Sequence, residues 1–330
     1  MKILYQTDDG YIFEAQEDAL KYEEIINKYK LDDGNKAEVY LSLKDKIDIE
    51  PFLNKNFNEN QLYFIRKAIQ KKLDITIFKE QIFDEYQMEQ IIRGLEDNLN
   101  ISLYAKTDFI SSQMKEIRLG LKNDLEVWYA NPKFTFEQMS EIRWGLEDDL
   151  DVSLYADVKF SSCQMMRIRF GLFEGVDISW YANKKYDDIQ MSAILDGLIN
   201  NLDVSLYADP KYEGFQMYQI YSGLKSGIDV SIYSDPKFNA EQMEQIRLGI
   251  EANIDVKLYL NNDFTSSQMW QIRKGLEAGI NVETFLSPNI SKEEMIETRL
   301  KLVQEKENKE KLNNKQLNLL SRFISNFKNR

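Results

Sequence analysis

Arginine recurs at one spacing along the chain, in a pattern that could do chemistry. Each copy follows a recurring isoleucine or its substitute, and the series is Arg66, Arg118, Arg143, Arg169, Arg247, Arg273 and Arg299. A row of guanidinium groups can bind phosphates or carboxylates through paired hydrogen bonds. The alternative is a set of ion pairs to neighbouring Asp and Glu residues, repeated because the architecture repeats. We favour the ion pairs, because the surrounding sequence is acidic.

Aspartate recurs at a second position, which could suggest a row of cation sites. The series is Asp151, Asp177, Asp203, Asp229 and Asp255. Each precedes a short apolar stretch, where aspartate is a favoured helix N-cap. No EF-hand spacing appears in the sequence. We therefore assign these aspartates to capping and expect no metal site.

Side chains for nucleophilic catalysis are nearly absent. The chain has no histidine and one cysteine, Cys163, which excludes the Ser-His-Asp and Cys-His schemes and nearly every structural zinc site. Cys163 is expected in the first turn of a helix, but its equivalents in other units are variable polar residues, so we interpret it as incidental. Gly-rich phosphate loops are also missing. We expect no enzymatic activity and no cofactor, with a paired-carboxylate enzyme as the less favoured alternative.

Two helix positions carry large apolar residues in several repeats, and the residue type at each position varies along the chain. Leu119, Trp144, Phe170 and Leu248 share a position nearly opposite the expected core face, and Met166, Tyr218 and Trp270 lie one turn earlier. Exposed apolar groups in a row are typical of an interface hot spot. The alternative is packing between adjacent helices, and both interpretations stay open. These seven residues are the candidate partner-binding residues.

The elements that position these residues follow from a period of 26. The pair Gln-Met recurs at this spacing from Gln87 to Gln268, except for one step of 25 near Glu126–Trp128. Gln61 and Glu294 begin degenerate copies, and a further faded copy begins near Leu31. About eleven units therefore cover residues 31–302, and such self-similarity is the signature of a solenoid.

Each unit contains the signals of one long helix. In the unit that starts at Phe134, Thr135 and Gln138 form a capping box, and Phe134 and Met139 are the two ends of a hydrophobic staple. The same box is expected at Ser161, Asn239, Thr265 and Ser291, each followed three residues later by Gln or Glu. Gly145 lies within the helix, where glycine costs about 1 kcal/mol relative to alanine. Its recurrence implies a steric need, which we attribute to close approach of a neighbouring helix.

The end of each long helix is also marked. Asp149 and its equivalents are all Asp, Asn or Gly, the residue types that tolerate a left-handed conformation after a helix. Asp151 can then cap a second, shorter helix over Val152–Ala156. A long and a short helix fit 26 residues, so the sequence predicts an all-α fold, an α-solenoid of about eleven helix-pair repeats.

The two ends differ from the repeats. Residues 2–15 alternate around an Asp9-Gly10 turn, as a β-hairpin does, and residues 16–30 look helical, so residues 1–30 are predicted to form a small N-terminal ββα cap. Residues 303–330 are predicted as a charged linker and a basic amphipathic helix that contains Leu317, Leu320, Phe323, Ile324 and Phe327. We expect this helix to cover the last repeat, and docking to a partner is the alternative.

Charge limits the classes of partner. The net charge is −13, and residues 1–302 carry 52 acidic and 35 basic side chains, against 3 and 7 in residues 303–330. This balance opposes direct binding of the body to nucleic acid or to an anionic membrane. There is no apolar stretch long enough to span a membrane and no secretory signal at the N-terminus. The single cysteine fits a reducing compartment, so we expect a cytoplasmic protein.

The repeat string from Phe134 to Phe160, with its Gln-Met, Ile-Arg, Gly-Leu-Glu and Asp-Val-Ser-Leu-Tyr-Ala segments, resembles repeats in large proteins of bacterial conjugative elements and phages. The likeness covers residues 57–302 well and 31–56 weakly. Those repeats occur in arrays, mostly without an assigned activity, and carry no catalytic residues to transfer. The resemblance implies a mobile-element origin, for which proteins that block host immunity are a reasonable class.

Two functional hypotheses follow. The first is a non-enzymatic solenoid that binds a protein partner through an acidic and aromatic face, either as an inhibitor of a host immune effector or nuclease or, alternatively, as a scaffold or adaptor without an inhibitory role. The second assigns nucleic-acid binding to the basic C-terminal helix while the body recruits protein.

Overall fold

The computed structural model describes residues 3–80 and 83–328 of the chain. Within them, eleven repeat units each begin with a long helix, as the period predicts. The long helices are α2 (Asp33–Lys44), α3 (Glu59–Gln70), α5 (Glu85–Glu96), α6 (Ser111–Lys122), α7 (Phe136–Glu147), α8 (Ser162–Phe173), α9 (Asp188–Ile199), α10 (Gly214–Lys225), α11 (Ala240–Glu251), α12 (Ser266–Glu277) and α13 (Lys292–Lys328).

Short elements follow most of the long helices. They are η1 (Glu50–Lys55), α4 (Ile77–Glu80), η2 (Ile101–Leu103), η3 (Val152–Leu154), η4 (Ile178–Trp180), η5 (Val204–Leu206), η6 (Val230–Ile232), η7 (Val256–Tyr259) and η8 (Glu283–Phe285). All except α4 are 3₁₀ helices, so the expected second, shorter helix is present in most repeats as a single 3₁₀ turn that ends earlier than predicted. Asp151 caps η3 by accepting from the Ser153 N–H at 3.1 Å, but the buried Tyr155 must then turn into the core. This inward turn ends the short helix after one turn.

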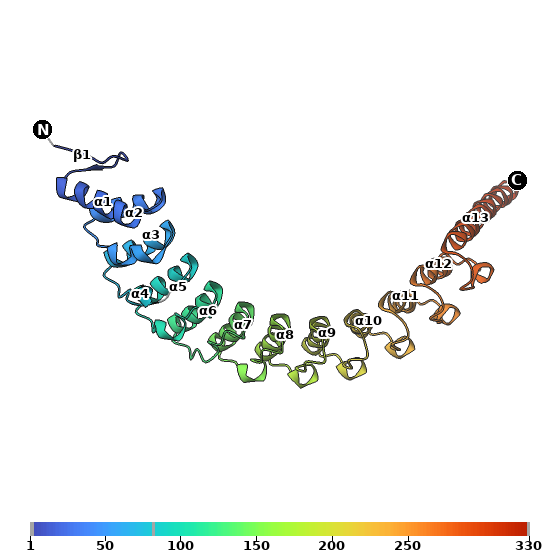
Figure 1. Cartoon of the computed structure of the whole chain (residues 1–330). Coiled ribbons are helices and arrows are strands. Elements are labelled where there is room, and N and C mark those ends of the chain that lie inside the picture. Colours follow the sequence, from blue (N-terminus) through green and yellow to red (C-terminus); the bar gives the residue numbers. More distant parts are fainter. Residues whose placement is uncertain (1–2, 81–82, 329–330) are drawn as a thin grey trace. The chain divides into compact units, whose positions relative to one another are not determined.

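The chain divides into two compact units, Met1–Met165 and Met166–Arg330. Inside each unit, successive long helices lie side by side, and the short elements follow one edge of the row (Figure 1). The core runs between the two rows and takes the recurring methionine, isoleucine and tyrosine of the repeats that begin with α5 to α11. The all-α solenoid is therefore confirmed, and each unit is described below by itself.

Tyrosine explains the recurring glycine of the long helices. A Cβ on Gly145 would lie 2.0 Å from the Tyr155 hydroxyl oxygen. That hydroxyl donates to the Glu141 carbonyl at 3.0 Å, inside the same helix. The expectation of a neighbouring helix is thus wrong, because the close approach comes from a ring of the same repeat. The same arrangement recurs at Gly94, Gly120, Gly171, Gly197, Gly223 and Gly249, each against its own tyrosine.

Glutamine joins one repeat to the next. The Gln138 Oε1 accepts from the Thr135 N–H at 2.8 Å, which completes the predicted capping box. Its Nε2 donates to the Phe160 carbonyl of the following repeat at 2.6 Å. Only an amide can accept at one atom and donate at the other, which explains glutamine where a capping box alone would allow glutamate. Glu294 stands at this position in α13, after which no further repeat follows within the described residues.

The ends of the long helices behave as predicted. Asp149 adopts a φ of 56°, and the Leu150 N–H then donates to the Gly145 carbonyl at 2.8 Å. The step of 25 residues is absorbed in the turn that follows α6, which lacks a 3₁₀ helix. Tyr129 nevertheless reaches the helix and donates to the Glu116 carbonyl at 3.2 Å. The missing residue therefore leaves the tyrosine contact intact.

The N-terminal cap has the predicted ββα form. Strands β1 (Tyr5–Gln6) and β2 (Ile12–Phe13) pair antiparallel, and helix α1 (Gln16–Tyr29) follows. Phe13 from β2 packs against Tyr22 of α1 and Tyr40 of α2, with ring centroids 5.6 and 5.0 Å apart. The cap thus covers the apolar face of the first repeat.

The C-terminal segment departs from expectation. Residues 303–328 contain no linker, because they continue the long helix of the last repeat as α13. Lys306 still contacts the array, since its Nζ donates to the Ala278 carbonyl at 2.7 Å. From 307 to 321 every residue is exposed, so this stretch does not cover the last repeat. The side chains of Phe323, Ile324 and Phe327 lie outside the described part.

Replacing Gly145 by alanine tests the tyrosine contact. Gly→Ala inside a helix ordinarily stabilises by about 1 kcal/mol. Here the methyl group meets the Tyr155 hydroxyl, so we expect the free energy of unfolding to fall by about 1–3 kcal/mol in urea denaturation. The double variant with Tyr155→Phe should recover part of the loss, because Ala68 and Phe78 already occupy the equivalent positions of an earlier repeat. A stabilised single variant would contradict the contact.

Alkaline pH should unfold the repeats cooperatively. Burial raises the pKa of Tyr104, Tyr129, Tyr181, Tyr207, Tyr233 and Tyr259 above the ordinary value of 10.0. Above that value the unfolded chain releases these protons and the folded chain keeps them. The free energy of unfolding should therefore fall by about 1.4 kcal/mol per tyrosine and pH unit.

The measurement is tyrosinate absorbance in the near ultraviolet, followed together with helical circular dichroism. We expect the exposed tyrosines to titrate first and the buried ones only as helical signal is lost. Tyr207→Phe should make the unfolding less steep. Ionisation of the buried tyrosines at full helical signal would show that the rings are accessible.

Candidate protein-binding face

The long helices of each unit present one surface to solvent, which we call the long-helix face. Its positions are counted from the recurring glutamine, so that in α7 the arginine Arg143 is at +5 and Trp144 is at +6. Three of the seven predicted partner-binding residues are exposed there: Trp144 at 40%, Phe170 at 42% and Trp270 at 37%. The other four are half-buried, namely Leu119, Met166, Tyr218 and Leu248.

The seven residues are divided between the two units. Leu119 and Trp144 belong to unit 1, and the other five belong to unit 2. Tyr218 is held by polar contacts, since its hydroxyl lies 2.9 Å from both the Ser192 hydroxyl and the Asp196 carboxylate. The half-buried residues fill space along the array, whereas the three aromatic rings are exposed to solvent.

Arginine holds the exposed rings in place. The Arg143 guanidinium lies over the Trp144 ring at 5.4 Å, and the Arg169 guanidinium lies over Phe170 at 5.1 Å. In α12 the Trp270 ring is covered at 5.3 Å by Arg299 from the next helix. Such cation–π contacts restrict the rings before any partner arrives, which lowers the entropic cost of binding.

The recurring arginines connect neighbouring repeats. The Arg143 Nε donates to Glu116 of the preceding repeat at 2.9 Å, and its NH1 donates to Glu147 at 2.7 Å. The predicted ion pairs are confirmed here and at Arg66, which contacts Glu38. For Arg118, Arg247, Arg273 and Arg299 the acceptor at +3 is a glutamine. The first three still form the predicted ion pairs, with Asp97, Glu251 and Glu277. These guanidinium groups are therefore engaged within the array.

The arginine series has three interruptions. Ile92, Leu195 and Tyr221 stand at +5 in α5, α9 and α10. By register they face Phe64, Arg167 and Ala193 at +3 of the preceding helix, none of which is a hydrogen-bond acceptor. Donor and acceptor thus disappear together, which is expected if the pair serves the packing of repeats.

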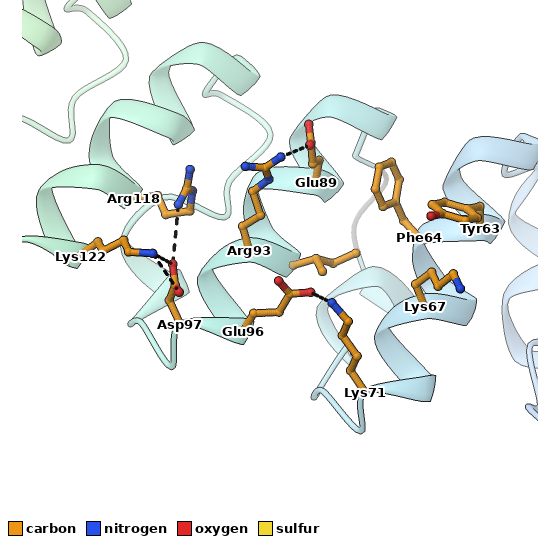
Figure 2. Close-up of a pocket in the computed structure, with 11 residues that line it drawn as sticks. Tyr63, Phe64, Lys67, Lys71, Glu89, Arg93, Glu96, Asp97, Arg118 and Lys122 are labelled. Carbon is orange, nitrogen blue, oxygen red and sulfur yellow. Dashed lines mark hydrogen bonds and ion pairs between the residues drawn. The ribbon is translucent and has the colours of Figure 1, made fainter.

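A groove of about 580 Å³ crosses α3, α5 and α6 in unit 1 (Figure 2). Its charged lining is paired: Lys71 contacts Glu96, Arg93 contacts Glu89 at 2.7 Å, and Lys122 contacts Asp97 at 3.0 Å. Tyr63 and Phe64 form its apolar end on α3. Sequence reasoning missed this groove, because its residues occupy positions that vary from repeat to repeat.

A second row of exposed apolar residues was also missed. It lies on the short elements, at the residue that precedes each recurring tyrosine. The members are Leu103, Trp128 and Leu154 in unit 1 and Trp180, Leu206, Ile232 and Leu258 in unit 2. The strict recurrence of an apolar type before the tyrosine was the available signal.

The remaining candidate groups have ordinary local roles. Hydrogen bonds from Ser179 and Ser231 lower the pKa of Asp177 and Asp229, as capping requires. Cys163 is exposed. Within residues 3–80 and 83–328, no group of three or more Cys, Asp or Glu side chains is arranged to hold a metal ion. None of the described helices is both long enough and apolar enough to cross a bilayer.

Comparisons with known proteins add no relative. No protein-family model matches the chain, and neither the curated proteins nor the solved structures contain a significant match.

Two of the recurring arginines provide a matched test of the contacts that they make between repeats. Arg143 and Glu116 are both nearly buried, so Arg143→Leu leaves a carboxylate without its partner. We expect a loss of about 3–5 kcal/mol in the free energy of unfolding. In Arg273→Leu the buried partner left behind is the neutral Gln245, and the loss should be nearer 1–3 kcal/mol. The second partners, Glu147 and Glu277, are equally exposed in the two repeats and do not distinguish the variants.

Leucine is already present at this position as Leu195, so both variants should fold. Adding Glu116→Ala to Arg143→Leu should recover stability, because it removes the unpaired charge. Urea denaturation at neutral and acidic pH measures both effects. Equal losses for the two arginines would show that the charge of the partner is irrelevant.

Proposed function

We propose that the chain is a non-enzymatic protein-binding α-solenoid. The observation that carries this proposal is the set of exposed aromatic rings held by arginine on the long-helix face, Trp144, Phe170 and Trp270. Aromatic and arginine side chains dominate the binding energy of protein interfaces. The recurring glutamines, tyrosines and capping aspartates are engaged in internal hydrogen bonds. Binding of a partner would therefore use the exposed positions, whose residues vary from one repeat to the next.

A narrower role is an inhibitor of a host immune effector or nuclease. The acidic balance of residues 1–302 supports it, because an acidic surface can occupy a basic nucleic-acid site. The mobile-element origin rests on the sequence resemblance alone. A scaffold or adaptor without inhibitory activity is the alternative, and it does not depend on the acidic charge.

Alanine variants of the aromatic rings test the proposal. In this test the full chain is used to capture its partner from bacterial lysate. The partner is then purified, and its affinity for the parent chain and for each variant is measured. Trp144→Ala combined with Phe170→Ala should weaken binding about tenfold or more, because each ring is a preorganised anchor. Helical circular dichroism should stay unchanged, because both rings are exposed. Unchanged affinity would remove these rings from the interface.

Leu154→Ala combined with Leu206→Ala is the matched control on the short elements. It should leave affinity within about twofold if the long-helix face binds. Raising the salt concentration separates the two roles. A partner that handles nucleic acid should dissociate steeply with salt, since surface charge pairs are screened. Affinity that does not depend on salt would contradict the inhibitor and favour the scaffold.

A further inference from the structure

Helix α8 departs from the acidic character of the chain. Its twelve residues include Arg167 and Arg169 and no aspartate or glutamate. The chain as a whole has 55 acidic and 42 basic side chains. Charge on the long-helix face is therefore locally inverted at α8, in the part of the helix that belongs to unit 2.

Arg167 lacks the partner that its position normally serves. It stands at +3, where most repeats place Glu or Gln to accept from an arginine 28 residues later. Here the residue at that distance is Leu195. The Arg167 Nε is buried and has no hydrogen-bond partner among the described residues. A buried donor without an acceptor costs about 1–3 kcal/mol. Unlike Nε, the terminal nitrogens of this half-buried side chain are not both buried and unpaired, so an acceptor from outside would contact them.

A carboxylate of the next helix already has a hydrogen-bond partner. Asp196 of α9 lies 2.9 Å from the Tyr218 hydroxyl, which also contacts Ser192. Neither oxygen of Asp196 accepts from the Arg167 Nε, which has no hydrogen-bond partner within the described part of the chain. The guanidinium of Arg167 therefore keeps its charge for a further contact.

Exposed apolar side chains accompany this charge on α8 and α9. Phe173 is 60% exposed and Ile199 is 42% exposed, and Phe170 lies one turn before Phe173. Phe173 and Ile199 stand at +9, a position that is Glu in α5, α7, α11 and α12 and Lys in α6 and α10. The packing of repeats does not need apolar residues there, because the charged ones fit. We call Arg167, Phe170, Phe173 and Ile199 the α8–α9 patch.

We propose that the α8–α9 patch binds a segment of a partner protein that presents one carboxylate to Arg167 between apolar side chains that cover Phe170, Phe173 and Ile199. This inference rests on the proposed protein-binding function and names where and what the chain binds. A carboxylate matches a guanidinium in charge and geometry, and arginine and aromatic residues together are typical hot-spot groups. The basic tail of this chain is a poor occupant, because residues 311–328 contain no carboxylate side chain.

Substitutions drawn from the other repeats test the patch without disturbing the fold. Arg167→Gln introduces the residue that α5, α10, α11 and α12 have at +3, and Phe173→Glu and Ile199→Glu introduce the common residue at +9. The matched controls in the same unit are Lys225→Glu at +9 of α10 and Lys274→Leu at +6 of α12, which likewise copy other repeats and lie outside the proposed binding residues. All variants should keep the helical circular dichroism of the parent.

A displayed library of random short peptides is the probe, selected on the full chain and counted against the triple patch variant. We expect the enriched peptides to carry Asp or Glu between apolar residues. Arg167→Gln should weaken their binding about tenfold, and Phe173→Glu should weaken it as much. Changing the peptide carboxylate to its amide should cost about tenfold on the parent and little on Arg167→Gln. The controls should change affinity less than about twofold.

Equal enrichment on the parent and on the triple patch variant would overturn the inference, as would enriched peptides without a carboxylate. Tighter binding of a synthetic 311–328 peptide would replace the partner by a second copy of this chain and would also overturn it. The purified partner protein separates this failure from failure of the proposed function. A partner that binds the parent and Arg167→Gln equally contradicts the patch alone, whereas the absence of any bound protein contradicts both.

Discussion

One amide group holds the array together. The recurring glutamine accepts a hydrogen bond from the backbone at the start of its own helix and donates one to the backbone of the next repeat, as Gln138 does between Thr135 and Phe160. A carboxylate can make only the first of these bonds. Helix initiation and repeat stacking are therefore coupled through one side chain. In the first unit the shorter Asn35 occupies this position and makes only one of the two bonds. It donates to the Phe57 carbonyl at 3.0 Å, but its buried Oδ1 has no partner among the described residues.

Local signals in the sequence predict the repeats well, because the contacts involved are short in range. The capping box of Thr135 and Gln138 and the left-handed residue Asp149 are set by neighbours within one turn of chain. The ring contact of Tyr155 with Gly145 spans ten residues and a turn, so the sequence indicates a close approach without identifying its source. The same limit explains why the short helix after Asp151 ends early.

The candidate site was less predictable, because exposure depends on what the neighbouring repeat covers. Trp144 and Leu119 share a position, yet one is exposed and the other half-buried. A helical wheel places Phe173 and Ile199 at the margin of the core face and does not show that they reach solvent. The groove at Tyr63 combines side chains from three helices, and no single repeat contains it. Such features emerge only when the repeats are stacked.

Structural and variable positions are separated in this fold. Glutamine and tyrosine bond backbone groups, and the +5 arginine bonds a side chain of the preceding helix. These bonds lie within a repeat or between neighbouring repeats and do not use the outer positions. Arg167 is the exception, since it occupies a structural position and lacks the structural partner. A departure of this kind is easier to recognise in a repeat array than in an irregular fold, because the other repeats provide the reference.

The turn after α6 loses one residue and its 3₁₀ helix, yet Tyr129 still reaches the Glu116 carbonyl. Changes in chain length are therefore absorbed on the edge that carries the short elements, while the helices keep their phase. An epitope, a protease site or a fluorescent reporter inserted beside Trp128 would leave the opposite surface in register. The natural deletion thus marks a permissive site for engineering the array.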